Sequence, residues 1–349
     1  MPLILSVGGI FLALRYSREC YNGIESGIGF CLNVLIPSLF FFMIVAAFIV
    51  GSGIADTLCR PLGGLSHILF RLPPESLAVI LLSMIGGYPV GAACAEILYR
   101  DGRLSPSQAA KTVYIAVAAG PGFLINYIGV SLLDLPQAGY VLLAAQVIAL
   151  VLTGVIIGHT VKSEPIPHAV AKVQPKGNLL VNAVQSASRS AFHMCAMVVV
   201  FSALIEVTDA VVSDPVVCDI ASAIIEITNG CNRIAGNYPL WLTAFFVGFG
   251  GLSVHFQIFT SLKNVAIKKY LFFLFRIIQG IFAGIFTYIL VSIFPETQAV
   301  FSTAEVQSAG ISGTVWGSAA LILSSMVFLG SISQGGKYVL NRGYYNNRL

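Results

Sequence analysis

Apolar runs of about twenty residues follow one another along most of the chain, with short polar stretches between them. A helix of about twenty apolar residues crosses roughly 30 Å of hydrocarbon, because each residue rises about 1.5 Å. The pattern therefore predicts an all-α integral membrane protein with several spanning helices. The predicted spans are residues 35–54, 109–133, 139–158, 190–212, 240–262, 271–294 and 315–333, and residues 2–14 form a shorter apolar segment.

Two further apolar segments, 77–98 and 216–231, carry helix-breaking residues. The first contains Gly86-Gly87-Tyr88-Pro89 and the second contains Asn229-Gly230. If each segment enters and leaves the membrane on one face as a re-entrant hairpin, the basic residues gather on one side, as the positive-inside rule requires. The stretches on that side are 55–76, 99–111, 160–189, 263–276 and 334–349, and they hold 16 of the 19 Lys and Arg residues.

With two hairpins, the chain divides into halves that share one order of elements: span, hairpin, span, span. The halves start from opposite faces, so the pattern predicts an inverted-topology repeat, whose paired interruptions indicate a transporter binding site. A chance match is the alternative, because hydropathy is repetitive. The predicted parts are an N-terminal apolar segment (1–34), a first repeat (35–158), a polar cytoplasmic linker (159–189), a second repeat (190–294), and a final transmembrane helix with a cytoplasmic tail (295–349).

Composition excludes several other classes of protein. The chain is 57% hydrophobic and 10% charged, whereas soluble domains carry about 25% charged residues. Its basic residues lie between apolar runs rather than in one patch, so we expect no nucleic-acid binding. The seven cysteines form no Cys-x-x-Cys pair and indicate small buried apolar residues. The sequence contains no zincin, nucleophile-elbow, P-loop or Rossmann motif, so we expect no enzyme, metal or cofactor.

An interrupted helix at membrane depth leaves backbone N–H and C=O groups that must contact protein, water or a ligand. The N-terminus of a half-helix presents free N–H donors and favours an anion. A packing kink satisfied by neighbouring helices is the alternative. The substrate contacts predicted from the two breaks are Gly87, Tyr88, Gly91, Thr228, Asn229 and Gly230.

Glu226 precedes the second break, in a short apolar segment. A carboxylate inside the membrane is costly and usually functional. We expect Glu226 to accept a coupling proton, coordinate Na⁺ or bind a substrate donor. A structural ion pair with Arg233 or Arg189 is the alternative.

The span 240–262 contains small and polar residues, and Ser253 and Gln257 share one of its faces because they lie four residues apart. The matching span of the first half carries Asn126, so these three side chains are predicted to line a polar cavity. Hydrogen bonds that only hold the helices together are the alternative. His193 and His255 are candidate proton carriers, although packing hydrogen bonds explain a membrane histidine equally well.

At these residues the sequence resembles the YlbJ-type sporulation integral membrane proteins, within the wider group that carries the nucleoside recognition, or Gate, domain. The most specific strings are Gly-Tyr-Pro-x-Gly-Ala and Gly-Gly-Leu-Ser-x-His-x-Gln. Ala116-Val117-Ala118 departs from relatives, which often have polar Thr and Asn before Ala-Gly-Pro. This departure weakens any expectation of an identical ligand. The matching strings are 36–40, 87–92, 119–123, 226–230 and 249–257.

The resemblance implies a role in endospore formation, where a related protein is implicated in moving dipicolinate across the outer forespore membrane. It also implies kinship with concentrative nucleoside transporters, whose substrate lies between two re-entrant hairpins. The leading hypothesis is a multi-pass secondary transporter of the cell membrane for a small polar molecule such as dipicolinate. A nucleoside transporter and a non-transporting scaffold or sensor are the alternatives. The expected partners are the substrate and the lipid bilayer, and homo-oligomerisation is left open.

Overall fold

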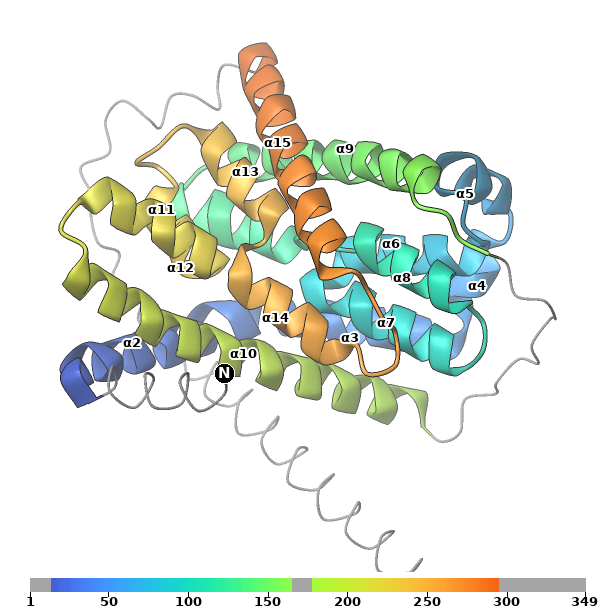
Figure 1. The fold of residues 1–349 in the computed structure, drawn as a ribbon, viewed down its shortest axis with the longest axis horizontal. Helices are drawn as coiled ribbons and strands as arrows, with labels where there is room; N and C mark the ends of the chain where they lie inside the picture. The colour runs from blue at the N-terminus through green and yellow to red at the C-terminus, as the bar shows by residue number, and fades with distance from the viewer. Residues whose placement is uncertain (1–13, 165–177, 295–349) are drawn as a thin grey trace, which may run out of the picture.

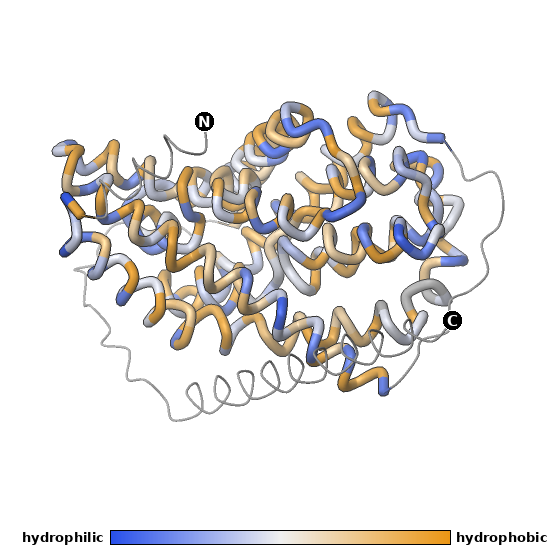
Figure 2. Tube along the Cα trace, turned by 60° about the horizontal axis from the view of Figure 1, so that its bottom comes forward, coloured by the Kyte–Doolittle hydropathy of each residue, from blue (hydrophilic) through white to orange (hydrophobic). Residues whose placement is uncertain are grey.

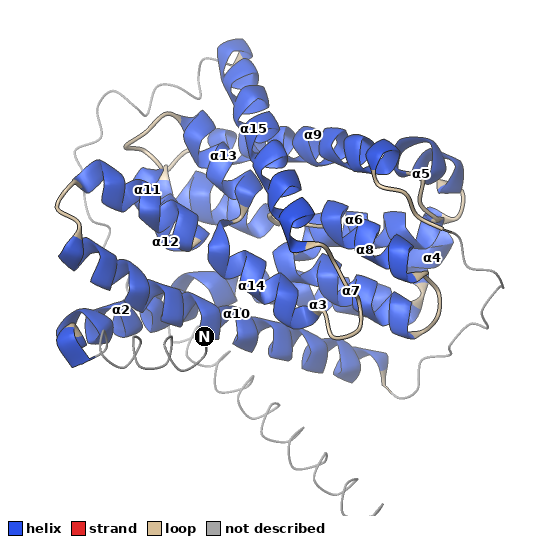
Figure 3. Ribbon diagram, in the orientation of Figure 1, coloured by secondary structure: helices blue, strands red, loops and turns tan. Residues whose placement is uncertain are grey.

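The computed structural model describes residues 14–164 and 178–294, and helices make up nearly all of this part of the chain (Figures 1 and 3). Its first portion contains α2 (Ser17–Phe30), η1 (Cys31–Leu35), α3 (Ile36–Ser52), α4 (Ile54–Cys59), α5 (Gly63–Phe70), α6 (Pro74–Gly86), α7 (Tyr88–Arg100), α8 (Pro106–Ile115), η2 (Gly122–Leu132) and α9 (Pro136–Thr160). Its second portion contains α10 (Leu179–Val211), α11 (Pro215–Ile225), α12 (Ile227–Ile234), α13 (Leu240–Phe249), α14 (Gly251–Ser261) and α15 (Lys269–Ile293).

Within the described ranges, five helical segments are long and apolar enough to cross a bilayer, and a bent α5–α6 pair would make a sixth if it forms one span. Figure 2 shows apolar positions along the length of these helices. The prediction of an all-α protein with several candidate spans is therefore confirmed. The five segments are Ser17–Ile49, Pro136–Thr160, Leu179–Val211, Leu240–Ser261 and Lys269–Ile293.

Several predicted boundaries differ from the structure. The boundary at residues 34 and 35 falls inside one long helix, because α2, η1 and α3 follow one another directly. Residues 179–189, predicted as part of the polar linker, are the first turns of α10, where the Asn178 side chain accepts the N–H groups of Leu180 and Val181. The apolar segments 2–14 and 315–333 lie outside the described residues, apart from Leu14.

Four of the apolar segments are interrupted helices. The break between α6 and α7 is at Gly87, as predicted. The second predicted break lies three residues earlier than expected, at Glu226, so Asn229-Gly230 falls within α12. Two predicted spans are also broken: 109–133 is unwound between α8 and η2, and 240–262 is broken at Gly250 between α13 and α14.

The local sequence explains these breaks. Gly87 and Gly250 have φ angles of +84° and +92°, a region that residues with a β-carbon adopt at a cost. Pro121 disfavours a helical conformation at the preceding residue, Gly120, and residues 116–120 are non-helical. Glu226 has an extended backbone (φ −144°, ψ 114°), and its carboxylate accepts the Asn229 N–H at the start of α12.

The interrupted helices lie in the layer between α9 and α10 (Figure 1). In Figure 1, α9 and α10 lie on opposite sides, α11 and α12 lie toward one end, α6 to α8 lie toward the other, and α14 lies between them. Apart from the short helices α4 and α5 of the first portion, the two portions share an order of elements: a long helix, two interrupted helices and a long helix. The inverted orientation of the two halves, and the entry of 77–98 and 216–231 into the bilayer as hairpins, remain predictions.

Glu96 of α7 links the two halves at the turn between α14 and α15. Its carboxylate accepts the backbone N–H groups of Lys263 (3.2 Å), Asn264 (3.0 Å) and Val265 (3.1 Å), and the side-chain amide of Asn264 (2.6 Å). Partial burial acts to raise the pKa of Glu96, but these donors outweigh it and hold the pKa below its ordinary value. The ionised carboxylate therefore organises this turn.

We expect Glu96→Gln to destabilise the detergent-solubilised protein by about 1.5–3 kcal/mol, the usual contribution of hydrogen bonds to a charged acceptor. The folded pKa lies below the unfolded value of about 4.3, so this stabilisation is complete above that pH and is lost as the pH falls through the folded pKa. Thermal unfolding at several pH values measures it, and the gap between wild type and variant should shrink in acid. Glu25→Gln, at an exposed position of α2, is the control, and an equal shift in both variants would contradict the prediction.

Candidate functional site

The four helix breaks meet in one place. A β-carbon at Gly120 would lie 3.4 Å from the nitrogen of Gly87, so the first two breaks lie side by side. A β-carbon at Gly251 would lie 3.0 Å from the nitrogen of Ile227, which brings the other two together. The start of α7 therefore adjoins the unwound stretch after α8, and the start of α14 adjoins the start of α12.

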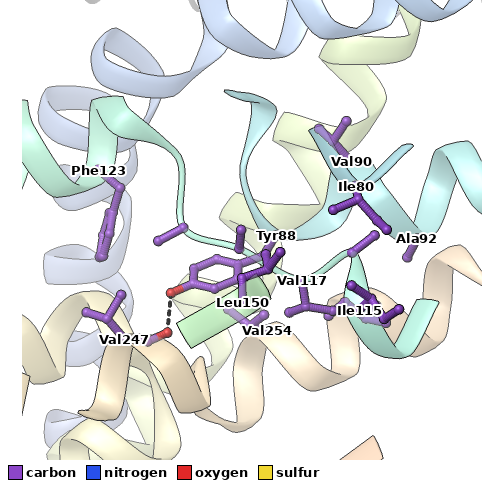
Figure 4. Close-up of a cluster of buried hydrophobic side chains, with 14 of the residues drawn as sticks. Ile80, Tyr88, Val90, Ala92, Ile115, Val117, Phe123, Leu150, Val247 and Val254 are labelled. Atoms are coloured by element: carbon purple, nitrogen blue, oxygen red, sulfur yellow. Dashed lines mark hydrogen bonds between the residues drawn. The ribbon is translucent and has the colours of Figure 1, made fainter. Parts of the chain in front are cut away.

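Two tyrosines join these pairs of breaks across the halves of the chain. Tyr88 lies against Gly250, and its hydroxyl donates to the carbonyl of Val247 at 2.7 Å (Figure 4). The hydroxyl of Tyr127 donates to the carbonyl of Thr228 at 3.1 Å. Both tyrosines belong to the first half and both acceptors to the second, so the breaks form one connected centre.

A small cavity of about 30 Å³ lies at this centre. Five predicted site residues line it: Gly87, Tyr88, Glu226, Thr228 and Gln257. The rest of its wall is mainly apolar and includes Leu39 and Met43 of α3 and Met194 and Val198 of α10. The structure therefore brings residues from both predicted hairpins and from the 240–262 segment around one cavity.

Glu226 supplies the carboxyl group of this site. Its side chain is buried, with 1% of the residue exposed. It accepts hydrogen bonds from the Thr228 hydroxyl (2.9 Å), the Asn229 backbone N–H (2.8 Å) and the Ser253 hydroxyl (3.3 Å). All three donors are neutral groups. The charge on such a carboxylate is costly in a low-dielectric site, and a bound proton or cation would offset that cost.

The alternative role for Glu226 involved an ion pair with Arg233 or Arg189. Arg233 instead forms a two-pronged salt bridge with Asp209 of α10. Arg189 lies on an exposed face of α10. Among the described residues, the hydrogen-bond donors to Glu226 thus include neither arginine.

Four other predicted residues support the centre rather than line the cavity. A β-carbon at Gly91 would lie 2.0 Å from the carbonyl oxygen of Ala116, and one at Gly230 would lie 2.3 Å from the Cα atom of Ala223. Both glycines therefore serve close helix packing. Ser253 donates to Glu226, and the Asn229 side chain donates to Ser202 of α10 at 2.7 Å.

The remaining predicted residues lie away from the cavity wall. Asn126 of η2 and His193 of α10 are exposed. His255 is fully buried, and its Nε2 lies 2.8 Å from the carbonyl oxygen of Phe249. Its ring contacts Phe249, Phe272 and Phe273. This aromatic surrounding suits a packing role for His255.

Arg276 is a buried residue that supports the centre and that the sequence interpretation missed, because it was counted among the basic residues of a surface stretch. In the structure it is fully buried in α15. Its guanidinium donates to the carbonyls of Tyr114 (2.6 Å) and Val117 (3.0 Å), and Gln279 also donates to Val117 (3.2 Å). These donors satisfy the backbone where α8 unwinds. An arginine inside a 25-residue apolar helix was the available signal, since buried charges in spans need partners.

Together, the fold and the centre define an integral membrane protein in which interrupted helices surround a buried carboxylate. No protein-family model and no solved structure matches the chain. The chain is similar to the sporulation integral membrane protein YlbJ of Bacillus subtilis (strain 168), with 22% identity over 321 residues that cover 79% of each chain. This similarity supports the YlbJ-type resemblance and the assignment as a multi-pass membrane protein.

We expect Arg276→Met to destabilise the protein by about 2–4 kcal/mol, because two buried carbonyls lose charged donors. The thermal unfolding transition in detergent measures the effect. Lys268→Met removes an exposed cation from the same end of α15 and should change stability by less than about 0.5 kcal/mol. Equal stability of Arg276→Met and wild type would show that the unwound stretch does not depend on this side chain.

Proposed function

We propose that this chain is a secondary transporter that moves a small polar organic molecule across a membrane during endospore formation. One observation carries the proposal. Four interrupted helices meet at a cavity that contains the buried carboxyl group of Glu226, whose hydrogen-bond donors among the described residues are all neutral. Interrupted helices in corresponding positions of two halves are typical of transporter binding sites. The similarity to a sporulation integral membrane protein supports the biological setting, and we propose the outer forespore membrane as the membrane concerned.

Transport requires the centre to open. The cavity of about 30 Å³ has room for about one or two water molecules, and a substrate with a six-membered ring is several times larger. The described conformation therefore corresponds to a closed state of the proposed cycle. Movement of one half against the other, with the two tracts 77–98 and 216–231 as re-entrant hairpins, would open the site to each side in turn.

A small carboxylate such as dipicolinate is the first substrate class that we propose. The resemblance to YlbJ-type proteins favours it, and the neutral donors of the broken helices suit carboxylate oxygens. Glu226 would repel an anion if ionised. We therefore propose that a proton or a Na⁺ ion binds at Glu226 and is transported with the anion.

A nucleoside is the second candidate substrate class. Among the cavity-lining residues, the ionisable side chains are Glu226 and Tyr88, and none is basic. A carboxylate and the Gln257 amide would suit the hydroxyl groups of a neutral sugar. Uptake of labelled dipicolinate and of labelled uridine into proteoliposomes, with an imposed proton or Na⁺ gradient, separates the two classes. Equal retention of both compounds in protein-containing and protein-free liposomes would contradict transport and favour the scaffold alternative.

We expect Glu226→Gln to abolish the dependence of uptake on the coupling gradient, because glutamine has no group that titrates and no negative charge to attract Na⁺. Its carbonyl oxygen can still accept from the Thr228 and Ser253 hydroxyls, whereas the Asn229 N–H loses its carboxylate acceptor. Gradient-driven uptake should fall to the rate of protein-free liposomes. Glu25→Gln is the matched control and should transport like wild type. A thermal transition close to that of wild type would show that Glu226→Gln folds. Undiminished gradient-driven uptake by that variant would assign Glu226 a structural role.

A further inference from the structure

A second, much larger cleft opens beside the closed centre. Its volume is about 520 Å³, and it lies between α3, α4, α7 and the first turns of α10. Arg60, Asp101 and Arg103 line it, and they belong to the stretches that the sequence places on the basic side of the membrane. Asp101 also pairs with Arg100 at 3.5 Å. The charged residues that line the cleft are thus two arginines and one aspartate, and the resulting net positive charge favours small anions.

The cleft and the central cavity share a wall. On α10, Asn182, Ser186 and Ser190 line the cleft, and Met194 and Val198 line the cavity. Residues four apart lie on the same face of a helix, so one face of α10 runs from the cleft to the cavity. Along the cleft this face alternates polar side chains with alanines, and at the cavity it is apolar.

Met43 of α3 lines both spaces. It is 2% exposed, and Met194 on the facing helix is 7% exposed. These side chains form an apolar constriction between the cleft and the site of Glu226, the kind of barrier that excludes water and ions. Methionine is unbranched and flexible, so Met43 can change rotamer without breaking a hydrogen bond.

We propose that the cleft is the vestibule through which a small anionic substrate reaches the central cavity from the basic side, and that Met43 is the gate between them. This proposal rests on the proposed transport function. It adds three features to that function: the cleft as the route of entry, the arginines whose charge favours carboxylates there, and Met43 as the residue that closes the route. The serine and asparagine side chains on α10 supply hydrogen bonds along the way.

Cysteine accessibility tests the vestibule without any transport assay. A membrane-impermeant, charged methanethiosulfonate reagent is applied to full-length protein in vesicles whose basic side faces outward, and labelled peptides are identified by mass spectrometry beside the native cysteines. Ser186→Cys lies in the cleft, and Val200→Cys, 56% exposed on the same helix, is the control that we expect to face lipid. We expect Ser186→Cys to react at least about tenfold faster, because only a thiol that contacts water ionises readily. Equal rates at the two positions would overturn the vestibule.

A second pair of variants tests the gate. Val198→Cys lines the cavity beyond Met43 and should stay unlabelled when Met43 is present. Combined with Met43→Ala it should become labelled, whereas the volume-conserving Met43→Leu should leave it protected. Two outcomes would overturn the gate. One is labelling of Val198→Cys in the protein with native Met43. The other is continued protection of Val198→Cys in the Met43→Ala background, when Ser186→Cys in that background is labelled normally. These outcomes are read without substrate, so they are distinguishable from a failure of uptake.

Discussion

The structure depends on satisfying backbone groups where helices are interrupted inside an apolar protein. Each interruption frees N–H and C=O groups that lipid cannot satisfy. The protein supplies partners from segments far apart in the chain: Arg276 and Gln279 donate to the carbonyl of Val117 within the stretch 116–120. Tyr88 and Tyr127 donate to carbonyls of Val247 and Thr228 beside the other breaks. Breaks that need such partners must lie next to one another. The same requirement therefore creates the centre and fills it with polar groups.

The hydrophobic pattern predicted more of the fold than of the site. Long apolar runs identified most of the candidate spanning helices, and Gly87 marked one break correctly, because two glycines followed closely by a proline are a strong local signal. The breaks at Glu226 and within 109–133 were misplaced or missed. Their backbone conformation depends on tertiary partners such as Arg276, which hydropathy does not show. Arg276 itself looked like a surface charge, because its acceptors lie in a segment about 160 positions earlier in the chain.

For the candidate site, the sequence identified the residue types suited to binding more reliably than it identified where their side chains lie. Glu226, Thr228 and Gln257 line the cavity because polar groups in an apolar segment have few other places to lie. Asn126 looked equivalent but lies on an exposed face, since the π-helical winding of η2 turns side chains differently from an α-helix. The sequence could not identify Met43 and Met194 as cavity-lining residues, because an apolar residue within an apolar run carries no mark of the cavity that it borders.

The hydroxyl groups of Tyr88 and Tyr127 bear on how the two halves can separate. Each is a neutral donor to a neutral carbonyl, and such a bond contributes only about 0.5–1.5 kcal/mol. The contacts of Glu96 and Arg276 also join the halves, but at the centre itself the two tyrosine bonds are weak enough for thermal motion to release them. A phenol that swings away from its carbonyl also leaves a free acceptor in Val247 or Thr228. A visiting molecule with its own hydroxyl or amide could occupy that acceptor and delay reclosure until it departs.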